Sequence, residues 1–330
     1  MPDGISRSVS ALSEALLHRG HRVTLLTDEP TDPAVLRRHF PADALPEVHA
    51  APSSTAAPGS ASSDVLGLLR PDVAVHNGGC GRPSVPPGLA PGVRLHHLAL
   101  DDRHLHSLPA HFTNGARRRI AAISTELREA LGRELGTPTS TLALLPLCVR
   151  LRSYCGAPLV HRERALAHFG TAAEQRPEAS IRLMEHVPGA LLYVVGRKTT
   201  AVREALDGLP PAAHARVRLT GPLPLSWMRE LIGAVRGVLV PARHATPTIP
   251  PVVLAALASR TPILCTSGIS ADAVEHDVTG FVDPFDRWAE HARRLLEEEV
   301  LWRRLSNGAA IRAGRFSAER IADRYEALAA

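Results

Sequence analysis

Residues Gly237 to Asp272 read GVLVPARHATPTIPPVVLAALASRTPILCTSGISAD, and this stretch decides the fold class. Its two short apolar runs, 238–240 and 263–265, have the length of buried strands, and a helix-like segment, 252–259, lies between them. Strand, helix, strand is the pattern of a parallel βαβ unit. Ligands of such units bind beyond the carboxyl ends of the strands, near the next helix N-terminus, so we expect a site in the loop 242–251.

The composition is that of an ordinary globular protein with room for two domains. The chain has 330 residues, of which 45% are hydrophobic and 22% charged. The net charge of +5 comes almost wholly from arginine, because Lys198 is the only lysine. A modest positive balance is compatible with a phosphate-bearing ligand, and we find no nucleic-acid-binding motif.

The sequence shows no secretion signal and no apolar run of about 18 residues, so we expect no membrane span. The cysteines lack the Cys-x-x-Cys spacing of redox and metal sites. We interpret them as reduced, buried thiols of a cytoplasmic protein. They are Cys80, Cys148, Cys155 and Cys265.

Periodicity and apolar runs predict the other elements. Apolar residues at helical spacing predict a helix over 5–17, and a second continuous helix is predicted over 288–305. A final amphipathic helix is predicted over 316–328. A turn is predicted at 76–79, directly after a short strand, and the segment 30–64 has little periodicity. Strands are predicted at 23–26, 72–75, 93–98, 119–124, 141–147, 191–196 and 217–221.

The frame of the 237–272 stretch resembles the C-terminal signature of the family 4 retaining glycosyltransferases, which have the GT-B fold. The matching positions are Val240-Pro241, Leu254, Ala256, Ala258 and Thr261-Pro262. The resemblance implies an α/β protein with two Rossmann-like domains that face each other across a cleft. It implies an acceptor-side domain over 1–150, a donor-side domain over 151–312 and a last helix, 313–330, that crosses back to the first domain.

The N-terminus resembles the family's glycine loop, which approaches the donor diphosphate through exposed backbone N–H groups. Gly4 matches the second glycine of that loop, and Asp3 stands at the place of the first. Family members have a strand before this loop, whereas the sequence starts at the loop. We therefore expect the sequence to lack the first strand of the N-terminal domain. Either the recorded start is too late, which we favour, or the domain has no such central strand, which would leave unpaired backbone groups in a buried sheet.

Four polar residues that hold the donor in this family are replaced. Gly170 matches the loop that opens the second domain, but Thr171 and Gln175 stand where the family has an arginine and a lysine for the diphosphate. Pro247 and Ala255 stand where the family has two glutamates. Each lost hydrogen bond to a charged group costs roughly 1.5–3 kcal/mol, so we expect an altered donor site.

Other polar residues are candidates to complete the site. Two cations follow the strand 191–196, and others lie in the 242–251 loop, although each is equally compatible with an ordinary position in solvent. These candidates are Arg197, Lys198, Arg243, His244 and Thr248. In the family a histidine after the strand 93–98 lies near the acceptor and the transferred sugar. His97 is the match and the predicted catalytic residue, with His96 next to it.

Three functions remain open from the sequence. The first is sugar transfer from a nucleotide-sugar donor to an unknown acceptor, which in this family needs no metal or other cofactor. The second is a catalytically inactive relative that supports a partner enzyme. The third is a cleft reused for another reaction, with a metal ion held by the histidines and aspartates of residues 96–111.

Overall fold

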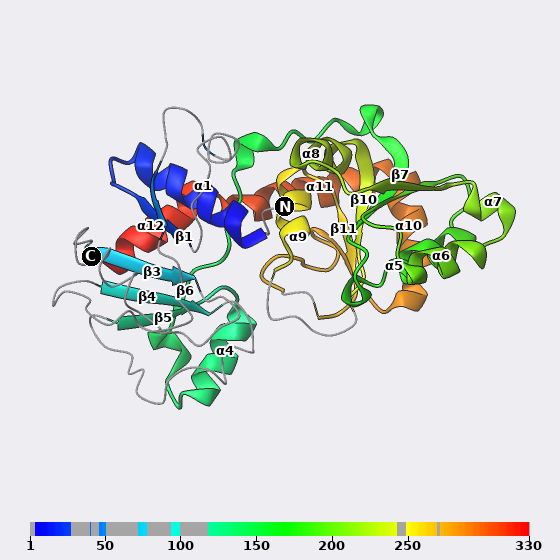
Figure 1. Cartoon of the computed structure of the whole chain (residues 1–330). Coiled ribbons are helices and arrows are strands. Elements are labelled where there is room, and N and C mark those ends of the chain that lie inside the picture. Colours follow the sequence, from blue (N-terminus) through cyan, green and yellow to red (C-terminus); the bar gives the residue numbers. More distant parts are fainter. Residues whose placement is uncertain are drawn as a thin grey trace. The chain divides into compact units, whose positions relative to one another are not determined.

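The computed structural model describes residues 4–27, 40, 46–50, 72–77, 94–99, 118–242, 249–268 and 271–329 (Figure 1). The chain forms two compact units. One is Met1–Cys148 together with Ala318–Ala330, and the other is Val149–Ser317. The sequence predicted divisions after residue 150 and before residue 313, and the units divide after 148 and after 317.

The first unit contains parallel strands throughout its described part. β1 (Thr24–Thr27) pairs with β2 (Glu47–Ala50). A separate sheet runs in chain order from β3 (Val73–Asn77) through β4 (Arg94–Ala99) and β5 (Arg118–Ala122) to β6 (Ala143–Leu144). Parallel strands joined by long connections are what a Rossmann-like domain requires.

The described part of the first unit contains the helices α1 (Gly4–His18), α4 (Thr125–Glu134) and α12 (Ala318–Ala329). α1 lies beside α12, although they are at opposite ends of the chain (Figure 1). Arg19 forms ion pairs with Asp323 at 2.7 Å and with Glu326 at 2.6 Å, which join the end of α1 to α12. The end of the chain is thus part of the first unit.

The second unit is built on a six-stranded parallel sheet with the order β12-β11-β10-β7-β8-β9. Renumbered from β7, this is the strand order 3-2-1-4-5-6 of a Rossmann fold, read from the other edge. The βαβ unit predicted from Gly237–Asp272 is confirmed, because β10 and β11 are parallel neighbours. The strands are β7 (Glu163–Phe169), β8 (Leu191–Val195), β9 (Val217–Gly221), β10 (Val235–Val240), β11 (Ile263–Cys265) and β12 (Gly280–Val282).

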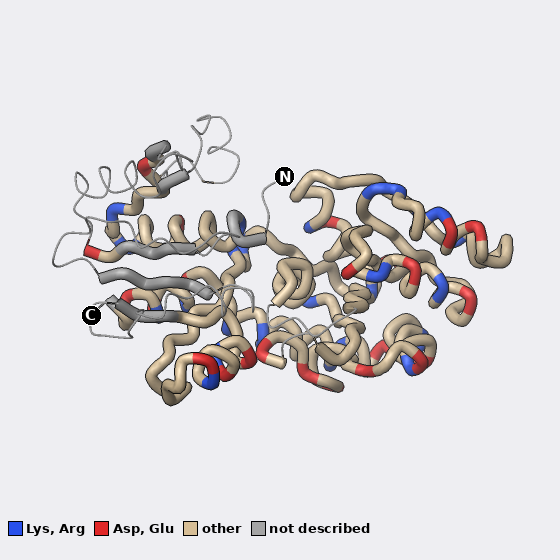
Figure 2. Tube along the Cα trace, turned by 60° about the horizontal axis from the view of Figure 1, so that its bottom comes forward, with Lys and Arg blue, Asp and Glu red and all other residues tan. Residues whose placement is uncertain are grey.

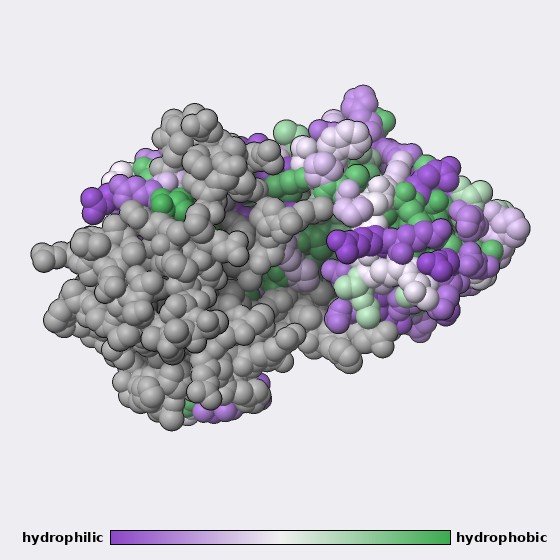
Figure 3. Space-filling view, in the orientation of Figure 1, coloured by the Kyte–Doolittle hydropathy of each residue, from purple (hydrophilic) through white to green (hydrophobic). Residues whose placement is uncertain are grey.

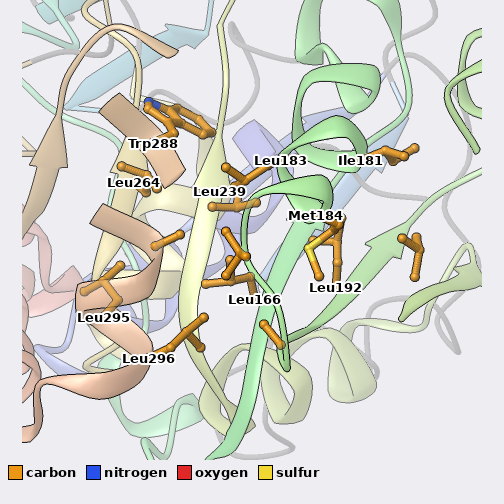
Figure 4. Close-up of a cluster of buried hydrophobic side chains, with 14 of the residues drawn as sticks. Leu166, Ile181, Leu183, Met184, Leu192, Leu239, Leu264, Trp288, Leu295 and Leu296 are labelled. Atoms are coloured by element: carbon orange, nitrogen blue, oxygen red, sulfur yellow. The ribbon is translucent and has the colours of Figure 1, made fainter. Parts of the chain in front are cut away.

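Helices cover both faces of this sheet, with α8 and α9 on one side and α5, α6 and α10 on the other (Figure 1). Leu166, Leu239 and Leu264, from three adjacent strands, form the core with Trp288 and other helix residues (Figure 4). The helices are α5 (Pro177–Arg182), α6 (Thr200–Asp207), α7 (Pro211–His214), α8 (Leu225–Ala234), α9 (Pro251–Ala258), α10 (Trp288–Glu297) and α11 (Glu299–Ala313).

Three predicted boundaries are wrong. His76 and Asn77 belong to β3 and not to a turn, because they continue the pairing with β4. The predicted helix over 288–305 is two helices, because the extended backbone of Glu298 (φ −93°, ψ 94°) ends α10 and caps α11. β2 lies inside the segment 30–64, for which no strand was predicted.

Charged residues of both signs are interspersed over the helices and loops of the second unit (Figure 2). The face of this unit in Figure 3 likewise shows hydrophilic and hydrophobic residues side by side. Such mixing is ordinary for a surface in contact with water. Within the described parts of the chain, no helix combines the length and the apolar character that a bilayer span demands.

Candidate functional site

The carboxyl ends of β7 and β10 are adjacent at the point where the strand order of the second unit reverses. From there the chain leads to β8 on one side of the sheet and to β11 on the other. Ligands of open α/β sheets bind at such a switch point. The loops 170–176 and 241–250, together with the adjoining loop 196–199, are therefore the candidate site.

The loop after β7 is closed by one of its own side chains. Gly170 has φ 98°, and a Cβ at this position would lie 2.0 Å from Oε1 of Gln175, so glycine is required beneath Gln175. The same Oε1 accepts a hydrogen bond from the N–H of Ala172 at 3.1 Å. Gln175 is therefore engaged within the loop in which the sequence placed it as a ligand-binding residue.

Thr171 connects this loop to the end of β8. Its side chain packs on Gly196, where a Cβ would lie 2.7 Å from Thr171 Cγ2. Gly196, with φ 148°, donates its N–H to the carbonyl of Gly221 at 3.1 Å, which ties the β8 loop to the end of β9. The structure thus brings together two predicted site residues, Thr171 and Gln175, with Gly170 on one loop.

The two predicted cations of the β8 loop, Arg197 and Lys198, are exposed. Neither side chain makes a hydrogen bond or an ion pair within the described structure. Thr199, which follows them, accepts from the N–H of Val202 at 3.3 Å and caps α6. Two exposed positive charges therefore directly follow Gly196, the residue on which Thr171 packs.

His168 is a residue of this edge that the sequence analysis missed. It lies in the buried run of β7, ERALAHF, and is 1% exposed. Its Nε2 is 2.7 Å from the carbonyl oxygen of Gly170, and its Nδ1 is 2.9 Å from Oγ of Ser180 in α5. Burial lowers the pKa of His168 to about 4. The sequence signal that could have identified His168 is a single histidine within an apolar strand.

The loop after β10 is described only at its ends. The N–H of Ala242 donates to Oγ1 of Thr266 at 2.9 Å, which joins the start of the loop to the segment after β11. Pro250 and Pro251 begin α9, and Ala255 is buried in that helix. The predicted site residues Arg243, His244, Pro247 and Thr248 lie outside the described residues.

Known protein structures share the two-unit fold described above over nearly the whole chain. Residues 169–298, all in the second unit, match the sequence profile of the family Glycosyl transferases group 1. No curated protein matches the sequence. A glycosyltransferase from Rickettsia africae matches with a TM-score of 0.75 and 9% identity over 98% of this chain and 93% of its own. HepE of Anabaena in complex with UDP-glucose matches with a TM-score of 0.72 and 17% identity, over 99% and 96%.

AviGT4, a glycosyltransferase involved in avilamycin A biosynthesis, matches with a TM-score of 0.66 and 18% identity, over 99% of this chain and 89% of its own. The fold is that of the GT-B glycosyltransferases. The profile match concerns the second unit, and the solved structures show the fold of the chain.

Two predicted residues of the GT-B site lie in the first unit. His97 is in β4, where it pairs with His76 of β3 and Ile120 of β5. Gly4 is the first residue of α1. His97 therefore lies within β4 and not after it, and the side-chain roles of both residues stay predictions.

A further polar cluster lies at the end of β12 in the GT-B second unit. Asp283 Oδ2 accepts from His291 Nε2 at 2.7 Å and lies 3.3 Å from His276 Nδ1. Nδ1 of His276 is also within 3.2 Å of the N–H of Val282, so this cluster fixes the end of the strand. No group of three or more His, Cys, Asp or Glu residues in the described ranges is arranged for a metal ion. The predicted cluster at 96–111 lies almost wholly outside those ranges.

Proposed function

We propose that the chain is a glycosyltransferase that takes a nucleotide sugar at the carboxyl edge of the second-unit sheet. The observation that carries the proposal is the position of the switch point, because its loops 170–176 and 241–250 both lie inside the segment that matches the glycosyltransferase profile. In this proposal the second unit is the donor side. The first unit, with Gly4 and His97, is the acceptor side.

Arg197 and Lys198 are proposed to hold the donor diphosphate in place of the neutral Thr171 and Gln175. Two unengaged cations beside the switch point suit two phosphate groups, because charge-assisted hydrogen bonds are roughly twice as strong as neutral ones. The backbone of Gly170 and the loop of Arg243, His244, Pro247 and Thr248 are proposed to complete the contacts. Ala255 supplies no polar side chain to the ribose.

Retention of the anomeric configuration, independence of metal ions and action in the cytoplasm belong to the same proposal. They come from the resemblance to the retaining family. The anomeric form of the product, followed by proton NMR during turnover, tests the first, and activity after treatment with EDTA tests the second.

We expect at least one nucleoside diphosphate to raise the thermal midpoint of the protein. A ligand present at tenfold its Kd stabilises the folded state by roughly 1.4 kcal/mol, which a thermal-shift assay detects. The panel is UDP, GDP, dTDP, CDP and ADP. A flat response to the whole panel, repeated with a chain extended upstream of Met1, contradicts the proposal.

Replacing Arg197 and Lys198 together by alanine is expected to weaken binding of the nucleotide found in the panel by at least about tenfold, because each lost charge-assisted bond costs roughly 1.5–3 kcal/mol. The matched control replaces Arg293 and Arg303, two exposed arginines of α10 and α11, and removes the same net charge. Titration calorimetry gives both values. Equal affinities for the two double variants show that the loop cations do not bind the donor.

One observation favours a second candidate, a catalytically inactive relative that supports a partner enzyme. Gln175 occupies the N–H of Ala172, a group that a phosphate-binding loop leaves for its ligand. If the wild type binds no nucleotide, the double variant Thr171→Arg/Gln175→Lys is expected to gain binding, because it places two cations on the same loop. Nucleotide binding by the double variant and not by the wild type supports the inactive relative. Nucleotide binding by the wild type excludes an inactive relative.

A further inference from the structure

A chain of hydrogen bonds runs from α5 through β7 into the candidate donor loop. Ser180 is fully buried, His168 is 1% exposed, and the two side chains are 2.9 Å apart. The second ring nitrogen of His168 reaches the carbonyl oxygen of Gly170 at 2.7 Å. The carbonyl of Gly170, the first residue after β7, is thus hydrogen-bonded to the buried pair of His168 and Ser180.

The direction of these bonds follows from the groups involved. A carbonyl oxygen only accepts, so the proton of the imidazole is on Nε2 and is donated to Gly170. Nδ1 is then an acceptor and takes the hydroxyl proton of Ser180. The ring is neutral at physiological pH because burial lowers its pKa to about 4. A single tautomer therefore satisfies all three groups.

The packing of the strand alone does not require a histidine. Leu166, two residues earlier and on the same face of β7, is a buried apolar residue of the core. A buried imidazole costs free energy unless both of its nitrogens are hydrogen-bonded. Both nitrogens of His168 are hydrogen-bonded, and the acceptor of one bond is the carbonyl of Gly170, which belongs to the loop and not to the sheet.

Fixing the Gly170 carbonyl also fixes the next N–H group. In a trans peptide the C=O and the following N–H point in opposite directions, and the structure contains no cis peptide bond in its described part. With the carbonyl of Gly170 directed at His168, the N–H of Thr171 points away from the buried imidazole. That N–H has no hydrogen-bond partner among the described residues.

We propose that His168 is a positioning residue, which with Ser180 directs the backbone N–H of Thr171 at the phosphate of the nucleotide donor. The inference rests on the proposed function and adds a donor to that site. Gln175 engages the N–H of Ala172 in the same loop, whereas the N–H of Thr171 stays accessible to a ligand. His168 itself touches neither the donor nor the reacting atoms.

The test compares His168→Leu, His168→Gln and Ser180→Ala with a control on the same strand and face, Leu166→Val. Hydrogen–deuterium exchange of the peptide covering 170–176 is measured for each protein, and its affinity for the nucleoside diphosphate found in the panel is measured by calorimetry. We expect His168→Leu to speed exchange in this peptide and to weaken binding at least about tenfold. His168→Gln, whose amide keeps an N–H for Gly170, is expected to restore part of both, and Leu166→Val to change neither.

Unchanged exchange at 170–176 in His168→Leu overturns the inference, and so does faster exchange with unchanged affinity. A loss of binding that is equal in His168→Leu and Leu166→Val shows a general effect of the core and also overturns it. If the wild type itself binds no nucleotide, the proposed function fails and this inference fails with it. That case is recognised before any variant is made.

Discussion

Replacing Arg162 by alanine is expected to lower the free energy of unfolding of the second unit by about 4 kcal/mol, because it leaves several buried acceptors without a donor. The guanidinium group of Arg162 is buried and has no acidic partner in the described structure. Its Nε donates to the carbonyl of Ala157 at 2.8 Å, and Nη1 donates to the carbonyl of Val235 at 2.8 Å. Burial lowers the pKa of Arg162 to about 10.

Two further bonds of Arg162 reach the end of α9. Nη1 donates to Oγ1 of Thr261 at 2.7 Å, and Nη2 donates to the carbonyl of Ser259 at 2.8 Å. The guanidinium also lies 4.8 Å from the ring centre of Trp302. One side chain therefore joins the start of β7 to the ends of α8 and α9, at the edge of the sheet opposite the switch point. A planar group with five N–H donors suits this task, and lysine does not reproduce it.

Urea unfolding followed by tryptophan fluorescence measures this loss. The control is Arg164→Ala, two residues later in β7, which removes an exposed ion pair with Glu297 at 2.7 Å. Such a pair contributes less than about 1 kcal/mol. A variant at Arg162 that is no less stable than the variant at Arg164 refutes the assigned role.

The elements that the sequence predicted best are strands that a loop follows directly. β11 and β9 have the predicted bounds, because ILC and VRLTG are followed by loop residues that end the run. The division between α10 and α11 was missed, since the surrounding residues LLEEEVLWRRL continue a helical pattern through Glu298. Trp302, in the first turn of α11, donates its Nε1–H to the carbonyl of Arg236 at 2.7 Å, a contact between residues that are 66 positions apart. No local pattern contains that contact.

The candidate site divides in the same way. The strand before Arg197 was predictable, because an apolar run followed by Gly196 is a local signal, whereas Gly170 was identified through the resemblance to the family. The pairing of His168 with Ser180 was not, since it joins a strand to a helix twelve residues later. The packing of the Gln175 side chain over Gly170 was also unpredictable, because it requires a residue without a Cβ at position 170.

The second large effect that we expect is a loss of stability in acid that is specific to His168. Its pKa in the folded protein is about 4, below the ordinary value of 6.5 that applies to the unfolded chain. The unfolded state therefore binds a proton more tightly than the folded state. The stability that the neutral imidazole confers is complete above about pH 6.5 and is lost as the pH falls toward 4.

The size of this loss follows from the two pKa values. A difference of about 2.5 pH units corresponds to roughly 3 kcal/mol. Other groups also titrate in this range, so the quantity to measure is the difference in free energy of unfolding between the wild type and His168→Gln. We expect that difference to change by about 3 kcal/mol between pH 7.5 and pH 4, with the wild type losing more, in urea titrations at a series of pH values. Parallel curves for the two proteins would mean that the imidazole is already accessible to protons in the folded state. The buried link between Ser180 and the donor loop would then not exist in solution.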